Sequence, residues 1–133
     1  MSNYNCRIIT DFKRPDKDLV EQFRDLPVAT LDDCMNRMAA MDSGLRSYTK
    51  GKLVGTAFTL KVPYGDNLMM HKSVELIKPG DVLVIQCENS MNRAIFGSLL
   101  VNDFKVKQAA GIVVDGAIRD SEEIGQMEGI SVY

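Results

Sequence analysis

The feature that most constrains the fold is the alternation of short strand-like segments with helical segments along the chain. Apolar residues recur at every second position over residues 53–62, which is the period of a half-buried strand. Residues 82–87 form a short apolar run, and the β-branched residues 112–114 form another, as expected for buried strands. Helical segments lie before and between these runs, and this order predicts an α/β fold.

The helical segments are placed by their capping residues and their apolar spacing. A first, polar helix is expected over residues 16–24, and the Thr-Leu-Asp-Asp sequence at 30–33 resembles a capping box that opens a second helix through about residue 40. Met35, Met38 and Met41 recur at a spacing of three, so we assign them to the apolar face of this second helix.

Two later helices and a last strand complete the expected order. Asn67 is a candidate cap for a helix that Pro79-Gly80-Asp81 ends. A further helix is expected over 97–108, with Phe96, Leu99, Leu100 and Phe104 at helical spacing. Residues 130–133 resemble a strand that is cut off as it begins, so we expect a chain truncated at its C-terminus.

Length and composition indicate one domain over residues 1–133. The chain has 45% hydrophobic and 26% charged residues, enough apolar material for a core. Its net charge of −2, with scattered Lys and Arg, gives no basic stripe for nucleic acid. The apolar runs are too short for a membrane span, and the N-terminus lacks a secretion signal. We therefore expect a cytoplasmic protein with no nucleic-acid or membrane partner.

Cysteine and histidine usage argues against several kinds of site. The three cysteines are Cys6, Cys34 and Cys87. They lie far apart and never in a Cys-x-x-Cys spacing, so the sequence indicates neither a disulfide framework nor a zinc site. We interpret Cys87, at the end of an apolar run, as a core residue. His71 is the only histidine, which argues against catalytic triads and zinc cages, and we assign it a structural or surface role.

Two glycine-containing turns precede predicted helices. The "GDNL" sequence at 65–68 follows the long strand, and Asp66 or Asn67 can accept hydrogen bonds from the first helical amides; a simple helix cap is the plainer interpretation. The "FGSLL" sequence at 96–100 opens the next helix. Its free amides at Ser98, Leu99 and Leu100 would form a small carboxylate or phosphate site, and Gly97 would let a ligand approach the backbone closely.

The third candidate is the adjacent pair Arg119-Asp120, just after the strand that ends in Asp115-Gly116. Exposed ion pairs contribute only about 0–1 kcal/mol, so stability alone is a weak reason for the pair. Arginine can bind a carboxylate with two parallel hydrogen bonds, and aspartate can bind a hard cation through oxygen. The pair is therefore our candidate for a combined anion and cation site.

The sequences "VGTAFTLKVPYGDNLMMHKSVELIKPGDVLVI" and "RAIFGSLLVNDFKVKQAAGIVVDGAIRD" resemble a known family. It is the family of 4-hydroxy-4-methyl-2-oxoglutarate/4-carboxy-4-hydroxy-2-oxoadipate aldolase and regulator of ribonuclease E activity A. The resemblance covers about residues 26–132. It implies a swivelling β/β/α domain, usually in a ring-shaped homotrimer. Some members are called demethylmenaquinone methyltransferases; because no Gly-x-Gly-x-x-Gly follows a strand here, we regard that label as a misnomer.

The resemblance implies a role for each candidate residue. Asp120 would hold a divalent cation, Mg or Mn, and Arg119 would contact a small 2-oxo acid substrate. The segment Gly97–Leu100, comprising Gly97, Ser98, Leu99 and Leu100, would give backbone amides to the substrate carboxylate. The expected function is therefore a metal-dependent lyase that cleaves an aldol, or decarboxylates oxaloacetate, to give pyruvate.

One position departs from the family's aldolase pattern, which has an acidic residue, twenty intervening positions and then Arg-Asp. Counting back from Arg119 leads to Ser98, whose neutral hydroxyl cannot act as a carboxylate base. The alternative function is a non-catalytic regulator that binds a protein partner such as a ribonuclease. The intact Arg119-Asp120 pair favours the lyase, and Ser98 favours the regulator.

Overall fold

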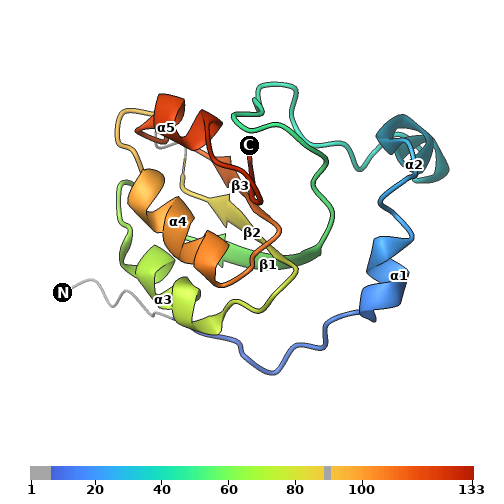
Figure 1. Cartoon of the computed structure of the whole chain (residues 1–133), viewed down its shortest axis with the longest axis horizontal. Helices are drawn as coiled ribbons and strands as arrows, with labels where there is room; N and C mark the ends of the chain where they lie inside the picture. The colour runs from blue at the N-terminus through green and yellow to red at the C-terminus, as the bar shows by residue number, and fades with distance from the viewer. Residues whose placement is uncertain (1–6, 89–90) are drawn as a thin grey trace.

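The computed structural model describes residues 7–88 and 91–133. Cys6 lies outside the described residues. Four parallel strands form one sheet in the order β1-β2-β3-β4 (Figure 1). Their bounds are β1 Thr56–Lys61, β2 Asp81–Gln86, β3 Gly111–Asp115 and β4 Ser131–Val132. The α/β prediction is confirmed, and each predicted strand is present with shifted ends.

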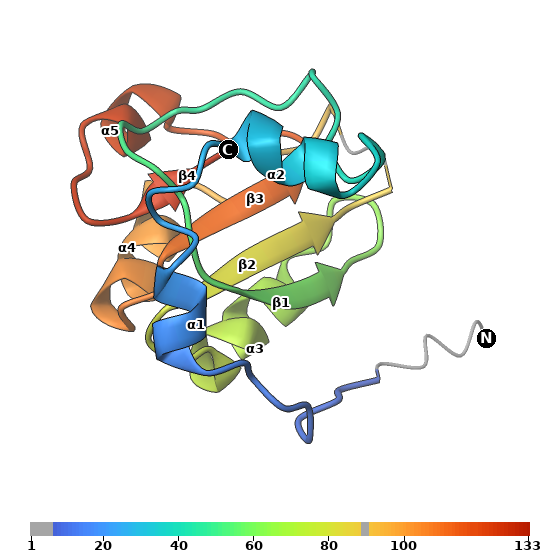
Figure 2. The same ribbon diagram turned by 90° about the vertical axis from the view of Figure 1, so that its right-hand side faces the viewer.

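Helices cover one face of this sheet. They are α3 Leu68–Leu76, α4 Ser98–Val106 and the short α5 Ser121–Gly125, which the sequence reasoning missed. Figure 1 shows these helices on one side of the sheet and the remaining two, α1 Lys17–Glu21 and α2 Val28–Cys34, on the other side. Figure 2 shows α1 and α2 in front of the opposite face of the sheet. Each parallel connection thus crosses through a helix, as parallel pairing requires.

The core lies between the sheet and the three helices α3, α4 and α5. Alternate strand residues face it, because successive side chains point to opposite sides of a strand. From the sheet it receives Leu83, Ile85 and Ile112, and from the helices Met70 and Phe104, all of them buried. The interpretation of Cys87 as a core residue is confirmed, since its side chain is fully buried.

The second predicted helix is wrong in its start and its length. α2 begins at Val28, after Pro27, three residues before the start at Leu31 that a Thr30 cap would give, so Thr30 lies inside the helix and is not its cap. It ends at Cys34 because Asn36 and Arg37 adopt positive φ angles of 59° and 58°. The three methionines do not form a buried face: their side chains are exposed, Met38 by 87%.

One apolar residue of α4 was also assigned wrongly. Phe96, Leu100 and Phe104 are buried as predicted, whereas Leu99 is 79% exposed. Leu99 directly precedes Leu100 in the helix. Because the helix has 3.6 residues per turn, neighbouring side chains point in different directions, and that of Leu99 points toward solvent. The predicted apolar spacing therefore holds for three of the four residues.

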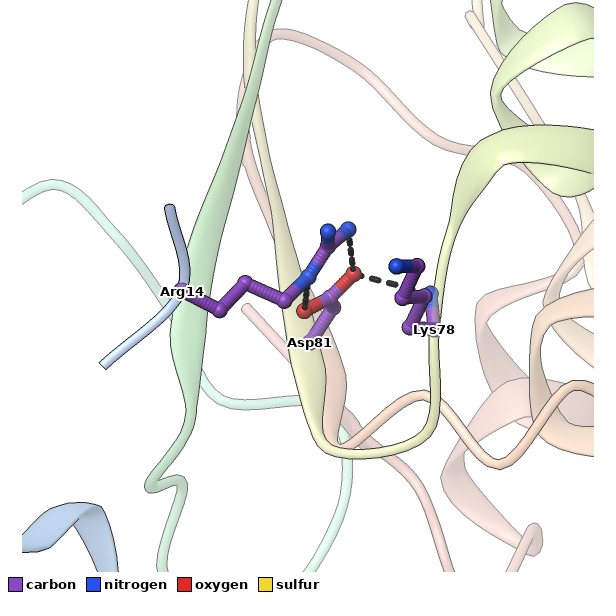
Figure 3. Close-up of polar contacts among 3 residues, drawn as sticks. All are labelled: Arg14, Lys78 and Asp81. Carbon is purple, nitrogen blue, oxygen red and sulfur yellow. Dashed lines mark hydrogen bonds and ion pairs between the residues drawn. The ribbon is translucent and has the colours of Figure 1, made fainter. Parts of the chain in front are cut away.

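The segment before α1 is fixed to the amino end of β2 by a buried carboxylate. Figure 3 shows Arg14 and Lys78 on two sides of Asp81, whose side chain is 1% exposed. The guanidinium donates to both carboxylate oxygens at 2.7 and 2.6 Å, and the backbone amide of Lys78 donates at 2.8 Å. The hydrogen bonds to Asp81 raise the pKa of Arg14 above its ordinary value. This contact joins the N-terminal segment to the sheet.

Within the described ranges, no helix has the length and apolar content that crossing a membrane would require.

Candidate functional site

The candidate residues lie in loops that follow the carboxyl ends of β2 and β3. A parallel bridge pairs Ala94 with Ala117. The backbone amide of Ile95 donates to the carbonyl of Ala117 at 2.9 Å, and that of Arg119 donates to the carbonyl of Phe96 at 3.0 Å. These bonds extend the pairing of the two strands into their loops. They bring the start of α4 beside the Arg119-Asp120 pair, as the sequence reasoning required.

Gly97 is the point where these two loops touch. A Cβ atom there would overlap the Oδ2 of Asp120 and lie 2.8 Å from Cγ and 2.9 Å from Nε of Arg119. A side chain at this position would therefore push Arg119 and Asp120 away from the positions that they occupy beside the start of α4. The space that we expected a ligand to use is occupied by the pair itself.

Asp120 adopts a left-handed backbone conformation, with φ 58° and ψ 34°, directly before α5. Its Oδ2 accepts a hydrogen bond from the backbone amide of Ser98 at 3.2 Å and one from the Ser98 hydroxyl at 3.4 Å. A negative charge at the first turn of a helix is stabilised by the unpaired amides and the helix dipole. Asp120 is therefore the anion that the start of α4 holds in this structure.

Arg119 remains largely accessible. Its side chain is 70% exposed, and its Nε lies 3.7 Å from the Oδ2 of Asp120, whose side chain is 39% exposed. An ion pair at that distance and exposure contributes little to stability. The guanidinium can therefore turn toward a ligand and bind a carboxylate through two parallel hydrogen bonds.

Two further amides belong to the first turn of α4. The first intrahelical bond runs from the amide of Val101 to the carbonyl of Gly97, at 3.2 Å. The amides of Leu99 and Leu100 precede it, so helix geometry leaves them without an intrahelical acceptor. Ser98 already donates to Asp120, so the first-turn amides left without a partner by helix geometry are those of Leu99 and Leu100.

The turn at 65–68 serves as a helix cap. The Oδ1 of Asp66 accepts a hydrogen bond from the amide of Leu68 at 2.9 Å, while Asn67 makes no side-chain cap bond. The same turn also contacts the loop after β2, because the Arg93 guanidinium carbon lies 5.4 Å from the centre of the Tyr64 ring. The sequence reasoning missed Arg93; a cation placed just after a predicted strand was the available signal.

The donor set fits magnesium better than zinc. Within residues 7–88 and 91–133, no three His, Cys, Asp or Glu side chains come together as metal ligands. The acidic residues Glu122 and Glu123 line an open hollow beside Asp120 without completing such a group. Magnesium usually keeps several waters and takes one or two carboxylates plus substrate oxygens. A single carboxylate at Asp120 matches that donor set.

The other candidate side chains lie elsewhere. His71 is exposed on α3, in agreement with a structural or surface role. Cys34, at the end of α2, is exposed and free.

The fold and these loops define a class of protein: a parallel α/β domain with an Arg-Asp pair set against the first turn of a helix. The chain belongs to the RraA-like family, Aldolase/RraA, whose profile matches residues 19–133. The resemblance seen in the sequence is therefore confirmed.

One relative is named as an aldolase, and another is described as a member of a ribonuclease-inhibitor family. A Halalkalibacterium halodurans protein, named as a candidate 4-hydroxy-4-methyl-2-oxoglutarate aldolase, is 36% identical over 104 residues, which are 77% of this chain and 50% of that protein. The Streptomyces coelicolor structure of RraAS2, described as an unusual member of the RNase ES inhibitor RraA family, is 32% identical with a TM-score of 0.77. The match covers 91% of this chain and 63% of that one.

A third relative carries the methyltransferase name. The Geobacillus kaustophilus structure described as S-adenosylmethionine: 2-dimethylmenaquinone methyltransferase is 30% identical, with a TM-score of 0.72, over 80% of this chain and 66% of that one. The chain thus spans between half and two thirds of the length of these three relatives.

Proposed function

We propose that the protein is a divalent-metal-dependent lyase that converts a small 2-oxo acid to pyruvate, by decarboxylation of oxaloacetate or by cleavage of a 4-hydroxy-4-methyl-2-oxoglutarate-type aldol. The main structural support for this proposal is the Asp120 carboxylate, which accepts a hydrogen bond from Ser98 at the start of α4 and has the exposed Arg119 guanidinium beside it. The aldolase names among the relatives support the proposal. A homotrimer, the assembly that the family resemblance implies, is part of the proposal.

Each site residue has a distinct part in this chemistry. Asp120 would hold Mg or Mn, which when bound supplies a Lewis acid for the substrate's keto group. Arg119 binds the 2-oxo acid's carboxylate and stabilises the negative charge that develops on the enolate. The amides of Leu99 and Leu100 hold the same carboxylate and orient it. Gly97 allows these groups to lie together, because any side chain would displace the pair.

The two reactions pass through the same enolate but differ in the proton that must move. Oxaloacetate loses carbon dioxide, and the electron pair left behind forms the enolate of pyruvate, which is then protonated. In the aldol, the bond between C3 and C4 breaks and the 4-hydroxyl group loses its proton as it becomes a carbonyl. Ser98 offers no carboxylate base for that proton, so water must take it. We therefore expect decarboxylation to be the faster reaction.

The test is pyruvate release from oxaloacetate and from 4-hydroxy-4-methyl-2-oxoglutarate, each with magnesium, with manganese and with EDTA. Spontaneous decarboxylation of oxaloacetate in the same buffer, with each metal and without protein, is the control. We expect release that depends on the metal, is abolished by EDTA and is faster from oxaloacetate. A folded protein that adds nothing to the background with either substrate would contradict the lyase.

The alternative is a regulator that binds a protein such as a ribonuclease. The neutral Ser98 favours it, together with two structural relatives, one described as a member of the RNase ES inhibitor RraA family and the other as the RNA-processing inhibitor RraA. Inhibition of a ribonuclease by a chain that releases no pyruvate would support this alternative over the lyase.

A further inference from the structure

The face of the sheet opposite α3, α4 and α5 carries a row of three polar side chains at the carboxyl ends of its strands. Lys61 of β1 is paired in register with Gln86 of β2, and Gln86 with Asp115 of β3; each is exposed and is the last residue of its strand. Their preceding neighbours Ile85 and Val114 belong to the core, so the row points away from it. Figure 2 shows this face, with the carboxyl ends of the three strands side by side.

The three residues of this row line one hollow of about 670 Å³, a volume within the range of small-molecule sites. The same sheet face contributes Val84 and Val113 to the lining, and the loop between α2 and β1 contributes Met41 and Leu45. None of the residues assigned to the lyase site belongs to the lining. The hollow thus combines apolar surface with the polar row, away from the Arg119-Asp120 pair.

The charged groups of the row are available to a ligand. Within the described part of the chain, the side chains of Lys61, Gln86 and Asp115 make no hydrogen bond or ion pair. Neighbouring strands lie about 4.8 Å apart, which places the Cα atoms of Lys61 and Asp115 about 10 Å from each other, with Gln86 between them. Asp42, the other carboxylate of the lining, already accepts a hydrogen bond from the amide of Gly44 at 2.7 Å. The hollow therefore offers one cation and one free carboxylate, held apart by the sheet.

We propose that this hollow binds a short ω-amino acid, a zwitterion whose carboxylate and ammonium groups are separated by a few methylene groups. Lys61 donates to the ligand's carboxylate, and the ligand's ammonium donates to Asp115. The methylene groups between them contact the apolar surface of Val84 and Val113. An acid or an amine of the same length would leave one charged side chain of the row without a partner. The site therefore selects the zwitterion over both.

The test compares three probes of equal chain length, 5-aminopentanoate, pentanoate and pentylamine, by NMR titration of the amide signals of the whole chain with EDTA present. Because each exposed ion pair contributes little, we expect wild-type protein to bind 5-aminopentanoate about fivefold more tightly than either other probe. The largest shift changes should include the amides of Val84 and Val113. Lys61→Met should bring the affinity for 5-aminopentanoate down to that for pentylamine, and Asp115→Asn should bring it down to that for pentanoate.

Two variants outside the hollow are matched controls. Lys78→Met removes an exposed lysine at the amino end of β2, where only its backbone amide bonds to Asp81. Asp103→Asn removes an exposed carboxylate of α4, on the other side of the sheet. Both should keep the full preference for the zwitterion. Arg119→Met should keep it as well, because Arg119 does not line the hollow.

Three results would overturn the inference. Wild-type protein that binds none of the probes, or binds all three equally, has no zwitterion site. Equal weakening of all three probes in Lys61→Met would mean that this residue does not bind the carboxylate end. Loss of the preference in Arg119→Met, with Lys61→Met unchanged, would place the binding at the Arg119-Asp120 pair instead.

Discussion

At the scale of single residues, the Asp120 carboxylate is needed for two different roles. Its carboxylate stabilises the start of α4, and the proposed chemistry needs the same carboxylate for a cation. Among the described contacts, the hydrogen bonds from Ser98 and the ion pair with Arg119 all use Oδ2. That leaves Oδ1 for the cation, so one side chain can meet both requirements.

Replacing Asp120 with asparagine separates the two roles. Asparagine tolerates the left-handed conformation, and its amide oxygen can still accept the hydrogen bond from Ser98, but the negative charge is lost. We expect Asp120→Asn to lower magnesium-dependent pyruvate release at least ~100-fold, equivalent to about 2.7 kcal/mol of barrier. The free energy of unfolding should change by no more than about 1 kcal/mol. Steady-state kinetics and urea denaturation measure the two effects.

Glu122→Gln is the control for this variant, because it removes a neighbouring exposed carboxylate, whereas the carboxylate that accepts the hydrogen bonds of Ser98 is that of Asp120. It should leave turnover unchanged. Full turnover in Asp120→Asn would remove Asp120 from the cation site.

At the scale of helices and strands, the sequence predicted the elements whose apolar period is long and regular. β2 and β3 were found because their β-branched residues are buried, and α4 because Phe96, Leu100 and Phe104 repeat along one face. α5 was missed because a five-residue helix with one buried residue, Ile124, has no period to detect. Its start was marked only by Ser121 and the acidic residues after it.

The same distinction explains what could be predicted of the site. Arg119, Asp120 and the glycine start of α4 are local motifs, so the sequence showed them. The hydrogen bonds between Ser98 and Asp120 depend on two loops that are 22 residues apart in the chain. The contact between Arg93 and the turn at Gly65 depends likewise on the order of β1 and β2 in the sheet. Neither follows from local spacing.

The contact between Arg14 and Asp81 makes a prediction at this scale. Removing one partner of a buried pair leaves a charge without its counter-charge, at a typical cost of about 3–5 kcal/mol. The amide of Lys78 still bonds to Asp81, so we expect Arg14→Met to lower the free energy of unfolding by about 2–4 kcal/mol. The midpoint of urea denaturation measures this.

The double variant Arg14→Met, Asp81→Asn completes a thermodynamic cycle. It no longer carries the unpaired charge, so it should be more stable than Arg14→Met alone. Arg37→Met removes the exposed pair with Asp33 and should cost no more than about 1 kcal/mol. Equal losses in Arg14→Met and Arg37→Met would show that burial of Asp81 does not decide the stability of this contact.

At the scale of the whole molecule, the N-terminal part differs from the rest. Neither α1 nor α2 contains a buried residue. Large apolar side chains are exposed along this part: Leu19, Phe23, Leu26, Val28, Met35 and Met38. Monomeric proteins seldom leave so much apolar surface in water, and such patches commonly mark contacts between proteins. In the proposed homotrimer, a neighbouring copy would cover them.

Limited proteolysis as a function of protein concentration tests this assignment. Trypsin can cleave after Lys17, Arg24 and Arg37, all in or beside α1 and α2. A homotrimer would dissociate on dilution, so we expect these sites to be cleaved rapidly at low protein concentration and to become protected at high concentration. Cleavage after Lys107, between α4 and β3, serves as the internal control and should depend less on concentration, since core packing within one chain positions that segment. Rapid cleavage in α1 and α2 at every concentration, while size-exclusion chromatography shows an oligomer, would place the interface elsewhere on the molecule.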